Sequence, residues 1–199
     1  MADVTWPAIF SPTHFHYYHI DQDRSGGQSL GGGEQIVFSP GARWGAQMTL
    51  PIWNTEQLLA IRAFRSALKG RANPVLLPNF DRLHLPVPNP AATFKAPGFP
   101  IGSTDVIATF TAGGAVELAG TQFGSNAHLY EIEASFAVGA DHHLTIWPPL
   151  RAAAVTGGNL YWIGSGCVCR MRCTNMSEQL QQLTDLHFDT LELEFEEYI

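Results

Sequence analysis

The chain has 199 residues, a formal net charge of -7, and charged residues at only 15% of its positions. Its length suits one domain, or one domain with a small lobe. The negative charge argues against nonspecific binding to nucleic acid or to an anionic membrane surface. We find no apolar run of the ~18 residues that span a bilayer and no secretory signal, so we expect no membrane partner and folding in a cytoplasm.

Glycine and proline punctuate the whole sequence, at 19 and 13 positions, and short apolar runs lie between them. This spacing predicts a mainly β protein, a sandwich or a barrel. Low charge also leaves much uncharged surface, which often lies against other subunits. We predict strands at 15–20, 34–39, 43–50, 74–77, 105–111, 115–119, 128–138, 143–147, 159–163, 166–173 and 188–197.

The first predicted strand contains three histidines in THFHYYHI. On a strand, His14 and His16 share one face and His19 lies on the other. Because a zinc site needs three or four converging ligands, we interpret this stretch as a half-exposed strand rather than a metal site.

Residues 25–34 read SGGQSLGGGE, in which five of ten residues are glycine. A phosphate-binding loop needs GxxxxGK[ST], and no lysine occurs before Lys69. The dinucleotide fingerprint needs a helix after it, whereas the strand-like VFSPGARW follows. Two interpretations remain: a permissive arm or hairpin loop used in assembly, or a surface turn without a role. The candidate arm residues are Gly26, Gly27, Gly31, Gly32 and Gly33.

One helix is predicted over about 54–69. Asn54 is a suitable N-cap, and Gln57 completes a capping-box pattern. Basic residues occupy its C-terminal half, where the helix dipole favours them, and Gly70 is a suitable stop. Apolar residues recur at helical spacing and predict packing across a sheet: Leu58, Ile61, Phe64 and Leu68, with Leu59, Ala60, Ala63 and Ala67 filling the same broad face.

The segment 78–102 holds six prolines, and Pro74 precedes it. Proline interrupts helices and central strands, so we expect a long extended excursion over the surface. Gly-Gly pairs at 113–114 and 157–158 predict tight hairpins. Asp141, His142 and His143 lie between strand-like runs and predict a turn rather than a metal or catalytic site.

CVCRMRC places Cys167, Cys169 and Cys173 on one face of a strand. Three sulfurs could bind a soft metal, but cysteines two apart on a strand lie ~6.5–7 Å apart, which is wide for one tetrahedral ion. Core packing is the alternative, so we expect no metal and keep the three cysteines as metal candidates to be tested. Neither a nucleophile elbow nor a paired-carboxylate site is visible, and the acidic tail LELEFEEYI alternates as a half-buried strand does. We expect no cofactor.

Several long stretches together resemble tail proteins of long-tailed bacteriophages, most closely the distal tail protein or a neighbouring minor tail protein. One stretch is RSGGQSLGGGEQIVFSPGARWGAQMTLPIWNTEQLLAIRAFRSALKGRANPVLL, and another is LTIWPPLRAAAVTGGNLYWIGSGCVCRM. The resemblance covers roughly residues 20–80 and 128–199. IWPPLR and LKGRANP are its most specific parts, and 78–102 has no counterpart in it.

The resemblance implies a virion protein of the viral tail tip, or baseplate, that is assembled in the host cytoplasm. It implies a β-sandwich or barrel related to tail-tube subunits, with residues 1–199 as a single tail-ring domain. It further implies a homo-oligomeric ring, commonly a hexameric ring, between tail-tube and tail-hub proteins. It also implies no enzymatic activity, and DNA is then only a passing cargo.

Three other functions remain open. One is an enzyme or metal protein that uses CVCRMRC, which a metal analysis without iron or zinc would exclude. A tail-tube subunit would share the same fold. A small β-sandwich carbohydrate-binding module would stack exposed aromatic side chains on sugar rings, with five candidates: Trp6, Trp44, Trp53, Trp147 and Trp162.

Overall fold

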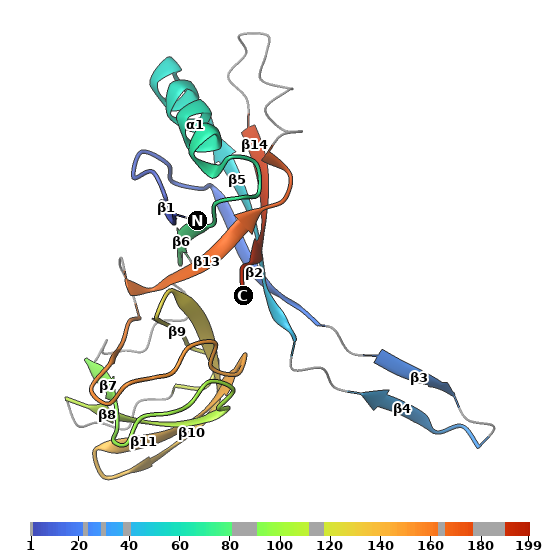
Figure 1. The fold of residues 1–199 in the computed structure, drawn as a ribbon, viewed down its shortest axis with the longest axis vertical. Helices are drawn as coiled ribbons and strands as arrows, with labels where there is room; N and C mark the ends of the chain where they lie inside the picture. Colours follow the sequence, from blue (N-terminus) through green and yellow to red (C-terminus); the bar gives the residue numbers. More distant parts are fainter. Residues whose placement is uncertain are drawn as a thin grey trace.

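The computed structural model describes residues 2–21, 24–28, 31–37, 41–80, 91–111, 118–162, 166–176 and 190–199. These residues form a mainly β protein with one helix, as predicted. Two six-stranded sheets make up most of the molecule, and a separate two-stranded hairpin projects from one of them (Figure 1).

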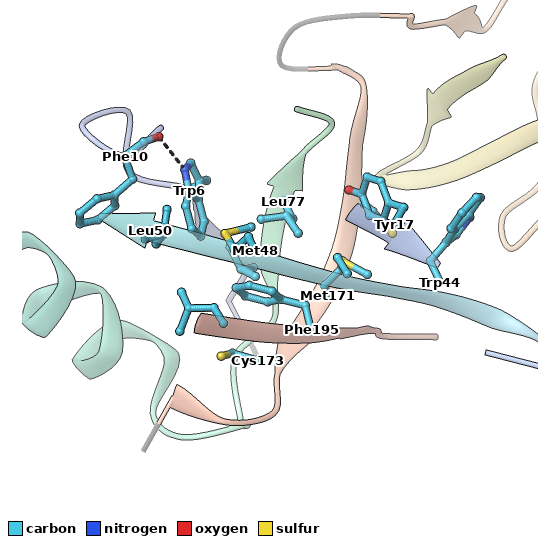
Figure 2. Close-up of a cluster of buried hydrophobic side chains, with 14 of the residues drawn as sticks. Trp6, Phe10, Tyr17, Trp44, Met48, Leu50, Leu77, Met171, Cys173 and Phe195 are labelled. Carbon is cyan, nitrogen blue, oxygen red and sulfur yellow. Dashed lines mark hydrogen bonds between the residues drawn. The ribbon is translucent and has the colours of Figure 1, made fainter. Parts of the chain in front are cut away.

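The first sheet has the strand order β1-β6-β13-β14-β5-β2. Its β1–β6 pair is parallel and its other pairs are antiparallel. The strands span Val4–Thr5 (β1), His14–Ile20 (β2), Arg43–Pro51 (β5), Val75–Pro78 (β6), Val168–Cys173 (β13) and Thr190–Glu197 (β14). One face of this sheet carries the larger hydrophobic cluster (Figure 2).

The second sheet is built from the chain between β6 and β13, in the order β12-β7-β8-β11-β10-β9. The strands span Ala92–Phe94 (β7), Asp105–Phe110 (β8), Gln122–Ser125 (β9), His128–Val138 (β10), Asp141–Trp147 (β11) and Asn159–Leu160 (β12). Gly124 in β9 and Tyr161 after β12 exchange two backbone hydrogen bonds of 2.7 and 3.0 Å. These bonds join the two ends of the sheet, which is therefore a nearly closed barrel with its own hydrophobic cluster.

The helix α1 spans Thr55–Leu68 and packs on the first sheet. Asn54 caps it by accepting from the Gln57 backbone N–H at 2.8 Å, and the Gln57 side chain accepts from the Trp53 N–H at 2.7 Å. Ile61, Phe64 and Leu68 are buried, as predicted, and the partly buried Leu58 packs against the same cluster. The prediction is wrong for Leu59, Ala63 and Ala67, which are exposed because they lie outside the buried stripe; the Leu59 side chain is 58% exposed.

Most predicted strands are confirmed within two residues, and 128–138 is confirmed at both ends. Asp141, His142 and His143 do not form a turn, because the turn lies at Gly139–Ala140 and these three residues begin β11. The hairpin predicted at Gly157–Gly158 is also wrong. Its flanks pair instead with more distant residues: Ala154 with Phe99, and β12 with β7. Residues 112–117 lie outside the described part, so neither the 113–114 hairpin nor most of the 115–119 strand is tested.

The proline-rich segment differs from its predicted surface excursion over residues 92–99. A proline-free run between Pro90 and Pro97 supplies β7, in which Ala92 and Phe94 are buried in the barrel. Phe99 packs against the same cluster. Residues 81–90 of the predicted excursion lie outside the described part.

A buried polar cluster joins the two sheets. The side chain of Glu197, at the end of β14, has no exposed area. One of its carboxylate oxygens accepts from the Trp44 N–H of β5 at 3.1 Å, and the other lies 3.1 Å from His128 Nδ1 of β10. Because a carboxylate only accepts, Nδ1 of His128 carries the proton of that bond. The Arg151 Nε lies 4.0 Å from the same carboxylate.

Two more hydrogen bonds surround this cluster. The Arg151 guanidinium donates to the Ala42 carbonyl, and Trp44 Nε1 donates to the Leu129 carbonyl at 2.8 Å. The Trp44 bond joins β5 of the first sheet to β10 of the second. The Arg151 bond joins the segment after β11 to the residue just before β5. The Glu197 cluster therefore fixes how the barrel sits on the first sheet.

We predict that Glu197→Ala lowers the free energy of unfolding by about 3–5 kcal/mol, because it leaves buried cationic and donor groups without their carboxylate. The measurement is urea unfolding of the full chain. The control is Glu133→Ala in β10, where the side chain is exposed, and we expect a change within about 0.5 kcal/mol. If the two variants unfold at the same urea concentration, the cluster does not hold the sheets together.

Candidate assembly surfaces

The glycine-rich stretch forms a β-hairpin, which we call the arm. Its strands are β3 (Arg24–Gln28) and β4 (Glu34–Val37), which pair only with each other in a sheet of their own. The arm continues the chain from the end of the β2–β5 pair, where Ile20 is opposite Arg43, and it projects away from both six-stranded sheets (Figure 1). The hairpin interpretation of this loop is thus confirmed, whereas its use in assembly stays a prediction.

Glycine geometry explains two features of the arm. Gly27 has a φ of 82° at an irregularity in the pairing between Ser25 and Gln28, and Gly32 has a φ of 80° in the turn region. Residues other than glycine rarely adopt such φ angles. Gly26 lies within β3, and Gly31 and Gly33 flank Gly32. All five candidate glycines therefore lie on this hairpin.

The arm is exposed wherever its side chains are described, at residues 25–27, 31–33 and 36. Ile36 is 64% exposed although it is a large apolar residue on a strand. A two-stranded ribbon with an exposed apolar side chain is a surface that neighbouring protein can cover.

The uncovered face of the first sheet carries the predicted histidine pattern. His14, His16 and Tyr18 are exposed on one face of β2, and His16 and Tyr18 stack at 6.3 Å between ring centroids. His19 points to the other face, where it stacks on Trp147 at 3.8 Å. The division of the three histidines between two faces is confirmed.

The three cysteines are free thiols buried in the larger cluster, and Figure 2 shows Cys173 beside Met171 and Phe195. Burial raises the pKa of Cys167 and of Cys173 to about 11, and raises that of Cys169 well above its ordinary value. A thiol in such surroundings is a poor nucleophile and a poor metal ligand, because both roles need the thiolate. Within the described ranges no three His, Cys, Asp or Glu side chains gather as a metal site.

The five tryptophans differ in their exposure to solvent. Trp6, Trp44, Trp147 and Trp162 are buried, and the Trp6 indole donates to the Phe10 carbonyl at 3.3 Å (Figure 2). Only Trp53 of the five is exposed, at 72%. Core packing therefore accounts for four of the five residues that were candidates for stacking on sugars.

Two surface features were missed in the sequence. A groove of about 320 Å³ on the barrel is lined by Phe136 and His143, whose rings stack at 4.5 Å, and by Asp105. A pocket at the end of α1 collects Arg62, Arg65, Lys69 and Arg71. The sequence signal for the pocket is the spacing of three basic residues on one helix face, a pattern that the helix dipole also favours.

No protein-family model matches the chain, and a search of curated proteins finds no match to its sequence. In the described part of the chain, no helix is both long enough and apolar enough to cross a membrane.

We predict that stability falls from about pH 9 upward. The folded state holds the thiol protons up to about pH 11, whereas unfolded thiols release them near pH 8.5–9, so stability that is full below the unfolded pKa is lost as the pH rises. Each thiol contributes a slope of about 1.4 kcal/mol per pH unit in this window. Urea unfolding from pH 8 to pH 11 measures it, and Cys173→Ala lowers the slope. A free energy of unfolding that is constant over this range would contradict the assignment.

Proposed function

We propose that the chain is a structural subunit of a bacteriophage tail, which forms a ring between the tail tube and the tail-tip hub. The observation that carries the proposal is the arm: an exposed hairpin that extends from a two-sheet body and carries Ile36 into solvent. An exposed strand edge can pair with another chain, and a head-to-tail contact closes into a ring when its rotation permits. The stretch from Arg24 to Leu77, which carries the resemblance to distal tail proteins, contains the whole arm and α1.

Charge and composition support the same function. Charged residues occupy only 15% of the chain, and charge is depleted at the centres of protein interfaces. The subunit carries a net charge of -7, which suits a ring through which DNA passes without sticking. In this proposal the chain works by assembly and catalyses no reaction. Its partners are further copies of itself, the tail-tube protein and the hub proteins.

A tail-tube subunit remains the nearest alternative, since it would use the same fold and also form rings. The two differ in how assembly continues. A tube subunit stacks on its own rings and grows into tubes, whereas a ring that joins tube to hub stops at one or two layers. Negative-stain images of the purified chain at high concentration distinguish them.

A carbohydrate-binding module is the second candidate function, favoured by the barrel groove. Phe136 is 62% exposed there and stacks on His143, and the Asp105 carboxylate lies in the lining. An aromatic ring beside a carboxylate is a suitable contact for a sugar. Glycan binding that Phe136→Ala removes would favour this function over a purely structural one.

We predict that Ile36→Asp prevents ring formation while the chain stays folded. Ile36 is exposed in one subunit, so the substitution changes the free energy of unfolding by only about 0.5 kcal/mol or less, but it places a charge where a neighbour covers the arm. Native mass spectrometry with negative-stain imaging is the measurement. We expect closed rings, hexamers above all, for the original chain and monomers for the variant.

The matched control is Val155→Asp, because Val155 is 68% exposed but lies beside the barrel and not on the arm. We expect it to assemble normally. Rings from Ile36→Asp as abundant as those from the control would rule out the arm as the assembly element. An original chain that stays monomeric and binds glycans would contradict the ring function itself.

A further inference from the structure

Four basic side chains line one pocket of about 500 Å³, which we call the basic pocket. It lies between the C-terminal end of α1 and the segment that follows β13. Arg62, Arg65 and Lys69 share one face of the helix, and Arg71 follows the turn that ends it. The other described lining residues are Ser66, Gly70, Cys173, Thr174 and Met176, and none of these five is acidic.

The cations of the basic pocket differ from the other described basic side chains in their partners. Outside it, four of them form ion pairs: Arg43 with Glu196, Lys95 with Asp141, Arg151 with Glu197 and Arg170 with Asp3. Arg172 lies over the Tyr198 ring at 3.9 Å. Within the described residues, none of the four pocket cations forms an ion pair, and Arg71 donates only to the Thr174 carbonyl, at 2.7 Å.

The helix dipole does not account for this arrangement. Its field favours cations only within the last turn of a helix. Lys69 and Arg65 lie at or in that turn, but Arg62 lies about one turn further back and Arg71 lies beyond the helix. All four side chains are exposed, and an anion bound among them would relieve the repulsion between their charges.

The same sheet presents suitable carboxylates on its opposite face. In β14 the alternate residues Leu191, Leu193 and Phe195 are buried on the side that α1 covers. Glu192 and Glu194 therefore point to the uncovered face, where both are exposed. Neither forms an ion pair with a described residue.

We propose that the basic pocket of one copy binds the Glu192 and Glu194 carboxylates of a second copy. The donor and acceptor surfaces lie on opposite faces of one sheet, so each copy offers both and the contact is head to tail. A head-to-tail contact closes into a ring when its rotation permits. The inference rests on the proposed function and names a contact that the ring would use in addition to the arm.

Charge reversal tests this contact in the full chain. Arg62→Glu with Arg65→Glu makes the pocket acidic, and Glu192→Arg with Glu194→Arg makes the uncovered face basic. We expect each double variant alone to associate about 100-fold more weakly than the original chain, because attraction becomes repulsion. Mixing the two double variants restores association, since each pocket then meets a face of opposite charge. The quadruple variant also assembles. Sedimentation velocity and native mass spectrometry measure both effects.

The rescue separates a lost contact from a folding defect, because two misfolded proteins do not repair each other. Glu133→Arg on the barrel is the control for an added charge away from both surfaces, and it leaves association unchanged. If the original chain forms rings and the reversed variants do so equally well, the contact is overturned and the ring function stands. An original chain that never associates overturns both. Binding of a short single-stranded oligonucleotide that only the pocket reversal abolishes, with no rescue on mixing, assigns the pocket to phosphates instead and overturns the proposal.

Discussion

The buried Glu197 carboxylate is the constraint on which the arrangement of the two sheets depends. An ionised carboxylate without exposed area is tolerated only with hydrogen-bond donors and cations around it. Trp44 supplies a donor from the first sheet, and His128 supplies one from the barrel. Because these partners come from separate sheets, the carboxylate is satisfied only when the sheets are docked as observed. The polar cluster thus adds directional hydrogen bonds to the apolar contacts that Leu129 and Trp147 make with the cluster of the first sheet.

Close backbone packing near the same junction adds to this constraint. Gly124 of β9 lies against the backbone of Gly166 and Cys167, where an added Cβ would come within 2.6 Å of existing atoms. Asn79, just after β6, also donates to Gln122 at 2.9 Å. These contacts join the two sheets, whereas the arm strands β3 and β4 form a sheet of their own. We infer that the fold divides its work between a rigid two-sheet body and a permissive hairpin.

Local signals predicted the fold well, and distant pairings were the main source of error. The helix was readable because Asn54, its cap, and the apolar stripe lie within one short stretch. The β10 strand was readable from its composition and flanking turns. By contrast, the Gly157–Gly158 turn joins segments whose partners lie some 60 residues away, near β7. The strand β3 was missed because its glycines have low strand propensity, and pairing with β4 overrides that preference.

The candidate surfaces were only partly visible in the sequence, for the same physical reason. The arm glycines form two runs within ten residues, so the hairpin could be predicted. The basic pocket needed the left-handed turn at Lys69 and Gly70, which brings Arg71 back beside the helix. The burial of four tryptophans was not visible in the sequence, because it depends on the packing of the two hydrophobic clusters.

Hydrogen–deuterium exchange of the arm amides, compared between dilute and assembled protein, tests whether the arm joins the subunits. We predict that exchange of the β3 and β4 amides slows markedly on assembly, because a neighbouring copy covers the hairpin. Exchange in β11, which has paired neighbours on both sides, stays unchanged. Assembled particles whose arm amides exchange as fast as those of the monomer would contradict the claim that the arm joins the subunits.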